Sequence, residues 1–280
     1  MSPEARAGGM RLLAFDTSTE LVLLAVVTPD GVWPALADGG AQASTTLIPQ
    51  ALALLERAGQ PLAGLDAIAF GAGPGAFTGL RTACAVAQGL AFGIDRPVLA
   101  LDSLAVVAEA AADDTDGAAT DADKLWVAQD ARMDEVYAAA YRRRRARPSG
   151  PGPVPETLAD PVGAIAWEPL VAPALYAPPA LAARWAGAPG EGPEAGPRAV
   201  VGSALEAFGD RLDTGLARRL PMPGPLARAS ALARLAAAAW RAGRGQDPAQ
   251  ALPVYLRDKV ALTTVERDAA ARAKAAGGAA

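Results

Sequence analysis

The sequence predicts an α/β protein with two lobes, and three observations support this class. Short apolar runs of strand length alternate with longer helical segments, which indicates sheets with helices on their faces. A strand–turn–strand pattern with Asp16 at its tip recurs at an offset of 114 residues, with Asp130 at the second tip. The 280 residues, 51% of them hydrophobic, are enough to bury two cores. We therefore expect two lobes built from related halves.

The first half of the chain is predicted as a hairpin followed by alternating helices and strands. A polar turn at 16–19 joins the two apolar runs of the hairpin. Because both runs are largely apolar, we expect a sheet that is covered on both faces. The next segment can begin a helix at the capping residues 44–46 and end it at Gly59. The expected strands are 10–15, 21–27, 65–70 and 97–101, and the expected helices are 44–58 and 78–92.

The second half repeats the hairpin at 125–141, after a small, acidic stretch at 111–123 that we interpret as a linker. Frequent Pro and Gly leave the structure of 142–197 open. A strand at 198–203, a helix at 226–242 and an extended segment at 253–261 are expected beyond it. The expected domains are a flexible leader 1–9, a first lobe 10–108, a second lobe 109–265 with Pro/Gly-rich insertions, and a disordered tail 266–280; helix 226–243 is a candidate to pack back onto the first lobe.

The composition removes several classes of function. Histidine is absent, which excludes Ser-His-Asp and Cys-His nucleophiles and histidine metal sites. The net charge of −4 argues against a protein that grips nucleic acid alone. Cys84 is the single cysteine, so no intramolecular disulfide can form, which fits a reducing compartment. The start of the sequence does not resemble a signal peptide, and no segment reaches the roughly 18 apolar residues of a membrane span. We predict a cytoplasmic protein.

A glycine-rich loop at 71–79, GAGPGAFTG, lies between an expected strand and an expected helix, an order found in anion sites at helix N-termini. It lacks the Lys of a Walker A loop. Gly71, Gly73 and Ala76 match a dinucleotide fingerprint with Asp102 as the ribose-binding acid, although Pro74 removes a backbone donor. A phosphate loop of a two-lobed ATP-binding fold fits better than the dinucleotide site. The preferred interpretation is structural: a tight turn that packs the helix closely on the sheet. The residues of such a vestigial nucleotide loop would be Asp16, Thr17, Gly73, Gly75, Thr78 and Gly79.

Two expected helices carry long stretches without charge, from Gly39 to Leu55 and from Thr82 to Ile94. A helix on the surface of a lobe normally keeps a polar face, and one that is apolar all round is buried on both sides. Burial inside one large lobe would explain this, but we favour a protein–protein interface. Alanines spaced four apart on the second helix would allow a partner helix to approach closely. The predicted partner-binding residues are Leu47, Ile48, Ala51, Leu55, Leu80, Ala83, Ala87, Leu90 and Ala91.

Other polar features have a functional and a structural interpretation each. The basic run Arg142–Arg145 with Arg147 suits either contact with a nucleic-acid backbone or a solvated hairpin end. Asp16 and Asp130 could bind a metal, but Asp at a turn more often caps backbone N–H groups. Cys84 is expected to be inert core. No catalytic residue and no metal site are assigned.

Four motifs in one order carry a family resemblance: LLAFDTSTE at 12–20, the loop and helix at 71–93, QDARMDEVYAAAY at 129–141, and PVYLRDKVA at 253–261. Together they resemble the TsaB (YeaZ-type) family. The resemblance implies the two-lobed actin and sugar-kinase-like (ASKHA) fold, with a mixed sheet and flanking helices in each lobe. The sequence departs from the family pattern at Ala43, where His is common, and at Ala72, where Arg is common.

The resemblance also implies a function. Such a chain is a non-catalytic scaffold that forms a heterodimer with TsaD, its catalytic paralogue, and works with TsaE, a small ATPase, to make threonylcarbamoyladenosine in ANN-decoding tRNAs. It implies tRNA contact only through the complex, no membrane and no intrinsic cofactor, with ATP or ADP at most at a subunit interface. It leaves open whether the chain alone is a homodimer or a monomer. The paralogue carries a histidine metal site, which a chain without histidine cannot build. The alternatives are a degenerate ATP-using transferase or kinase that relies on Asp16 and, less favoured, a peptidase-like protein.

Overall fold

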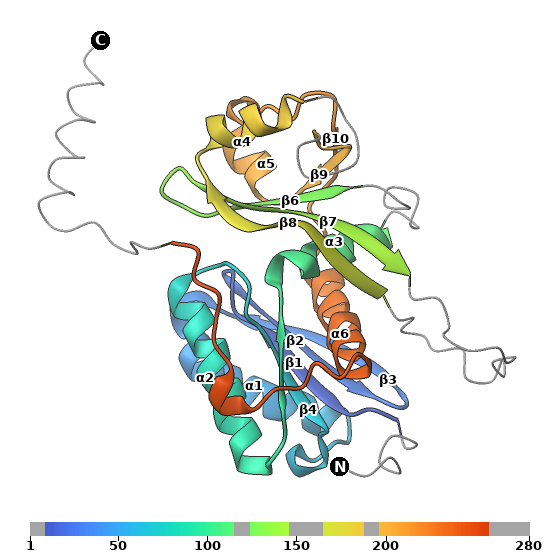
Figure 1. Cartoon of the computed structure of the whole chain (residues 1–280). Helices are drawn as coiled ribbons and strands as arrows, with labels where there is room; N and C mark the ends of the chain where they lie inside the picture. Colours follow the sequence, from blue (N-terminus) through green and yellow to red (C-terminus); the bar gives the residue numbers. More distant parts are fainter. Residues whose placement is uncertain (1–8, 115–123, 146–164, 188–195, 258–280) are drawn as a thin grey trace, which may run out of the picture.

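The computed structural model describes residues 9–114, 124–145, 165–187 and 196–257, which form two five-stranded sheets (Figure 1). The strand orders are β3-β2-β1-β4-β5 and β10-β9-β6-β7-β8. The strands of the first sheet are β1 (Leu12–Asp16), β2 (Leu21–Thr28), β3 (Gly31–Asp38), β4 (Ala67–Gly71) and β5 (Val98–Leu101). Those of the second are β6 (Leu125–Asp130), β7 (Val136–Arg145), β8 (Ile165–Tyr176), β9 (Ala199–Val201) and β10 (Arg218–Arg219).

The two sheets share one topology, as the recurring hairpin predicts. In the first, β1 pairs antiparallel with β2 and parallel with β4. In the second, β6 pairs antiparallel with β7 and parallel with β9. Asp16 and Asp130 therefore end the first strand of their respective sheets. The prediction of a two-lobed α/β fold is confirmed.

Helices form three layers around the sheets (Figure 1). The central layer, between the sheets, contains α3 (Ser103–Asp114) and α6 (Pro225–Arg241), and side chains of both sheets join these helices in one core cluster. The outer face of the first sheet is covered by α1 (Ala43–Arg57) and α2 (Phe77–Ile94). The second has α4 (Pro178–Trp185) and α5 (Ala204–Phe208) on its outer face. The central strands of each sheet are thus buried on both faces, as their apolar sequences require, whereas the edge strands β3, β8 and β10 are partly exposed.

Several elements differ from the sequence-based expectation. Residues 111–114, assigned to a linker, complete α3, because Ala favours helix and this helix is enclosed between the two sheets. The remainder of that linker, 115–123, the leader 1–8 and the tail 266–280 lie outside the described residues. Arg142–Arg145 extend β7 instead of ending a hairpin. Its partner β8 was not predicted because Pro169 and Pro173 interrupt it, which an edge strand tolerates.

Buried polar contacts fasten the central layer to the second sheet. Glu109 of α3 is 0% exposed; its carboxylate accepts hydrogen bonds from Arg234 Nε at 2.6 Å and from Trp167 Nε1 at 2.9 Å. The Tyr141 hydroxyl donates to Asp102 Oδ2 at 2.5 Å. Burial raises the pKa of Asp102, and it raises that of Tyr141 well above the usual tyrosine value. These contacts join α3, α6, β7 and β8 into one inter-lobe unit.

Candidate functional site

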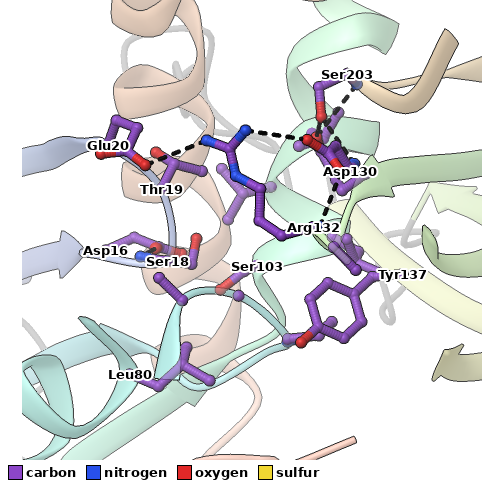
Figure 2. Close-up of a pocket in the computed structure, with 18 of the residues that line it drawn as sticks. Asp16, Ser18, Thr19, Glu20, Leu80, Ser103, Asp130, Arg132, Tyr137 and Ser203 are labelled. Carbon is purple, nitrogen blue, oxygen red and sulfur yellow. Dashed lines mark hydrogen bonds and ion pairs between the residues drawn. The ribbon is translucent and has the colours of Figure 1, made fainter. Parts of the chain in front are cut away.

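A cavity of about 750 Å³ lies between the lobes, where the tips of the two hairpins face each other (Figure 2). Its wall comes from the β1–β2 turn, the glycine loop and the start of α3 on one side. The β6–β7 turn and the start of α6 contribute on the other. Strand ends in each sheet therefore deliver the polar turns to one place. This arrangement makes the cavity the candidate site for a ligand.

The glycine loop packs directly on the first hairpin tip. Thr17 Oγ1 donates to Gly79 O at 2.6 Å, and the N–H of Ala76 donates to Ser18 O at 2.9 Å. A Cβ atom at Gly79 would lie 1.9 Å from Thr17 O, and one at Gly75 would lie 2.4 Å from Ser18 Cβ. The structure thus brings together the residues of the predicted nucleotide loop. Their glycines are explained by close packing, which is the interpretation that the sequence favoured.

The prediction that Asp102 binds the ribose of a dinucleotide is wrong. Asp102 was the candidate to bind a ribose, but both of its carboxylate oxygens are engaged inside the protein. Oδ2 accepts from the Tyr141 hydroxyl, and Oδ1 accepts from the N–H of Leu104 at 3.0 Å in the first turn of α3. Asp102 therefore caps a helix and joins the lobes.

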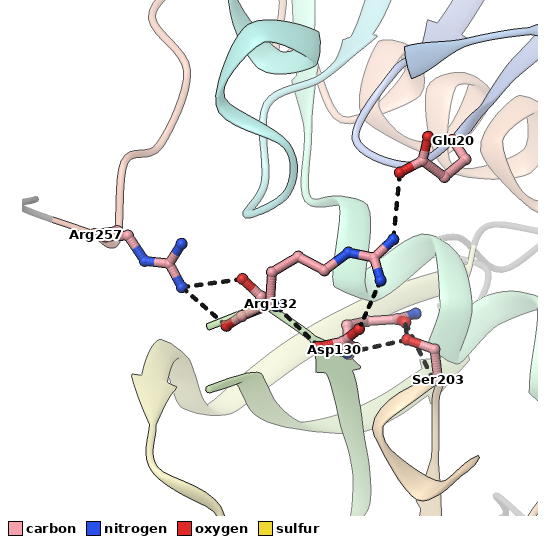
Figure 3. Close-up of polar contacts among 7 residues, drawn as sticks. Glu20, Asp130, Arg132, Ser203 and Arg257 are labelled. Carbon is pink, nitrogen blue, oxygen red and sulfur yellow. Dashed lines mark hydrogen bonds and ion pairs between the residues drawn. The ribbon is translucent and has the colours of Figure 1, made fainter. Parts of the chain in front are cut away.

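An arginine that the sequence analysis did not single out spans the two hairpin tips (Figure 3). The Arg132 guanidinium lies 3.3 Å from Glu20 Oε1 and 3.3 Å from Asp130 Oδ2. Arg132, Met133 and Asp134 all have left-handed backbone, with φ of 61°, 54° and 61°, which is strained for residues with side chains. Asp130 thus pairs with an arginine. Among the residues that the structure describes, no three His, Cys, Asp or Glu side chains are grouped to hold a metal.

The chain's last described segment forms what we call the C-terminal strap, residues 248–257, which begins with η6 (Pro248–Gln250) and runs beside α2 (Figure 1). Val254 N–H donates to Ala72 O at 2.8 Å in the first lobe. At the second lobe, Arg257 Nη2 contacts Glu135 Oε2 at 2.5 Å and Ala131 O at 3.0 Å, and so holds the left-handed turn. Figure 3 shows the Arg257 guanidinium beside Arg132. The motif PVYLRD at 253–258 therefore has a structural role in its described part: it links the lobes beside the cavity.

The predicted partner helices are present, but most of the predicted contact residues point inward. Of the nine, Ile48 is exposed and Leu90 is partly buried. The other seven are buried. Leu80 lines the cavity between the lobes. The remaining six are buried because both helices turn them toward the first sheet: Leu47, Ala51, Leu55, Ala83, Ala87 and Ala91. Cys84, as predicted, is buried, and burial raises its pKa. The assignment is corrected accordingly: these buried side chains cannot contact a partner, and only the opposite faces of the two helices are exposed.

Those outer faces define a surface that we call the α1–α2 patch. Its large side chains are Ile48 and Leu52 of α1 and Phe92 of α2, which is 59% exposed. Ala85, Gly89 and Gly93 follow one line along the exposed side of α2. The sequence showed the uncharged stretches but could not show which of two small-residue ridges, 83/87/91 or 85/89/93, faces outward.

The two matched lobes, each a mixed sheet with flanking helices, have the architecture of the actin and sugar-kinase-like class. Comparisons with known proteins identify the family. Residues 23–148 match the family model described as TsaD, tRNA N6-adenosine threonylcarbamoyltransferase. YeaZ from Pseudomonas aeruginosa has a similar structure, with a TM-score of 0.66 and 32% identity over 88% of this chain and 100% of that one. This chain belongs to the TsaB (YeaZ-type) family.

Curated relatives agree with this assignment. The tRNA threonylcarbamoyladenosine biosynthesis protein TsaB of Haemophilus influenzae is 37% identical over 49% of this chain and 56% of the relative. TsaB of Escherichia coli is 34% identical over 48% and 56%. The chain thus spans about half the length of these curated relatives. In the described part of the chain, no helix is long and apolar enough to cross a membrane.

Proposed function

We propose that this chain is a non-catalytic subunit that binds and activates a TsaD-type threonylcarbamoyltransferase, which makes N6-threonylcarbamoyladenosine in ANN-decoding tRNAs. The names of its curated relatives place them in this biosynthesis. The match to the TsaD family model supports a common ancestor, and a shared fold, for this chain and the catalytic subunit. In this role, the chain provides a protein surface and TsaD provides the chemistry.

The observation that carries the proposal is the α1–α2 patch. Large apolar side chains exposed on the surface of a domain can mark a binding site, and aromatic residues such as Phe92 are enriched at the centre of protein–protein interfaces. The residues beside it, Gly89 and Gly93, have no Cβ, and open space surrounds both positions. A partner helix can therefore approach the α2 backbone closely. A second copy of this chain could use the same patch when TsaD is absent.

Other features support a non-catalytic role. The chain has no histidine with which to reproduce the paralogue's metal site, and its overall negative charge suits contact with tRNA only through the complex. Arg132 pairs with the carboxylates at both hairpin tips. We place ATP or ADP, and a TsaE-type ATPase, at the boundary of the complex. An enzyme that relies on Asp16 would instead turn over ATP as an isolated chain.

Replacing Phe92 with Glu should weaken the complex with the same organism's TsaD-type protein about 30-fold, as expected for a central apolar anchor worth about 2 kcal/mol. The wild-type proteins should co-elute as a 1:1 complex in size-exclusion chromatography with light scattering, and calorimetry gives the affinities. Leu216→Glu is the matched control, since Leu216 is 93% exposed on the second lobe. Equal binding by wild type and the Phe92 variant would remove the patch from the interface.

A further inference from the structure

The cavity between the lobes contains three polar side chains whose hydrogen-bonding capacity is not met within the described chain. Ser103, at the start of α3, is 6% exposed, and its Oγ has no partner. Arg228, in the first turn of α6, has an enclosed Nε without a partner and makes no ion pair with a described residue. Asp16 is 2% exposed, and its one hydrogen bond comes from the N–H of Ser18 at 2.7 Å. All three line the same cavity.

Such unmet groups are unusual in the interior of a folded protein, because a buried polar atom normally has a partner. Burial lowers the pKa of Arg228, and the negative charge of Asp16 acts against that shift. The two charges therefore influence each other across the cavity without lying within ion-pair distance. A bound molecule that reaches both would satisfy them together with the Ser103 hydroxyl.

The charges of the wall decide which chemistry fits. Four carboxylates line the cavity, those of Asp16, Glu20, Asp130 and Glu206, against three arginines, Arg132, Arg228 and Arg257. Arg132 and Arg257 are already paired with carboxylates. A polyphosphate would face this excess of negative charge with one unpaired arginine. A compound with separated positive and negative groups meets Asp16 and Arg228 at once.

We propose that this cavity binds a small zwitterion that carries an amine and a carboxylate, with the amine at Asp16, the carboxylate at Arg228 and a further hydrogen bond from Ser103. Leu104, Val107 and Met222 provide an apolar wall for the rest of the molecule. The volume of about 750 Å³ is in the range of small-molecule sites. This site is separate from the α1–α2 patch and does not depend on the proposed partnership.

The test uses the purified chain alone and the twenty standard amino acids as probes, each tested singly by thermal shift and calorimetry. At least one should bind with 1:1 stoichiometry and raise the Tm. Arg228→Met should weaken that binding at least tenfold, and Ser103→Ala should weaken it several-fold. Arg241→Met, on the exposed end of the same helix, is the matched control and should bind as wild type does. Acetate, inorganic phosphate and ATP serve as comparison probes.

A second readout distinguishes a binding site from a structural contact. Without ligand, Arg228→Met should unfold at the same or a higher urea concentration than wild type, because it removes a charge that nothing satisfies. Arg228→Met is also made in the Asp16→Asn variant. If Arg228→Met destabilises the wild-type protein but not the Asp16→Asn variant, the two side chains stabilise each other, and the proposal is overturned. No binding by any amino acid, or tighter binding of ATP or phosphate, would overturn it as well.

Discussion

Replacing Glu109 with alanine should lower the free energy of unfolding by about 3–5 kcal/mol, the usual effect of removing one partner from a buried ion pair. Glu109 is fully buried in the layer between the sheets, and its two carboxylate oxygens bind Arg234 and the indole of Trp167. Without the carboxylate, the Arg234 side chain, 16% exposed, loses its contact with Glu109 inside the protein. The substitution therefore affects the contact between α3, α6 and the second sheet together.

Urea unfolding followed by circular dichroism measures this effect. Glu56→Ala is the control, because Glu56 lies on the exposed side of α1 and should change stability by no more than about 0.5 kcal/mol. Glu109→Gln keeps hydrogen-bonding capacity, so its loss of stability should lie between those of Glu109→Ala and Glu56→Ala. A change below about 1 kcal/mol for Glu109→Ala, in the range of an exposed pair, would contradict a stabilising role for this contact.

Replacing Gly79 with alanine should cost about 3 kcal/mol of stability, whereas the same change at Gly89 should add about 1 kcal/mol. Both glycines lie in α2, Gly79 in its first turn and Gly89 in its interior, so each substitution introduces a better helix former. A Cβ atom at Gly79 would come 1.9 Å from Thr17 O, a backbone atom that cannot move without displacing the hairpin tip. At Gly89, apart from its chain neighbours and the nearby backbone of its own helix, no atom lies within 4 Å of the added carbon. The difference between the two variants isolates the packing of the glycine loop on the hairpin.

Thermal and urea unfolding of both variants provide the comparison. Gly79→Ala should also enlarge the distance between the loop and the β1–β2 turn, which crystallography of the variant would show. If the two substitutions change stability by the same amount, the contact between Gly79 and Thr17 is not tight, and the glycine pattern needs another explanation.

The fold could be predicted from the sequence because its strongest signal is local. The hairpin at 12–28 and its counterpart at 125–145 each combine apolar strands with an Asp-tipped turn, and these features need no knowledge of distant contacts. α3 was missed for the opposite reason. It is enclosed by two sheets, so its sequence shows no polar face, and the acidic residues at 113 and 114 resemble a linker.

The site was harder to predict, since it depends on how helices are rotated and on contacts between distant residues. α2 has small residues on two ridges, and only its packing on the sheet shows that 85/89/93 is the exposed one. The pairing of Arg132 with Glu20 joins residues 112 positions apart. Arg228 resembles any arginine of an amphipathic helix until the fold places it in the cavity.

Reconstituted tRNA modification tests the non-catalytic partnership most directly. ANN-decoding tRNA is incubated with the TsaD-type protein, the TsaE-type ATPase and the threonylcarbamoyl-AMP adduct, and N6-threonylcarbamoyladenosine is measured by mass spectrometry. We predict formation of the modified base only when this chain is added, strong loss with Phe92→Glu and full activity with Leu216→Glu. Modification at the full rate without this chain, or by this chain in the absence of the TsaD-type protein, would contradict the proposed role.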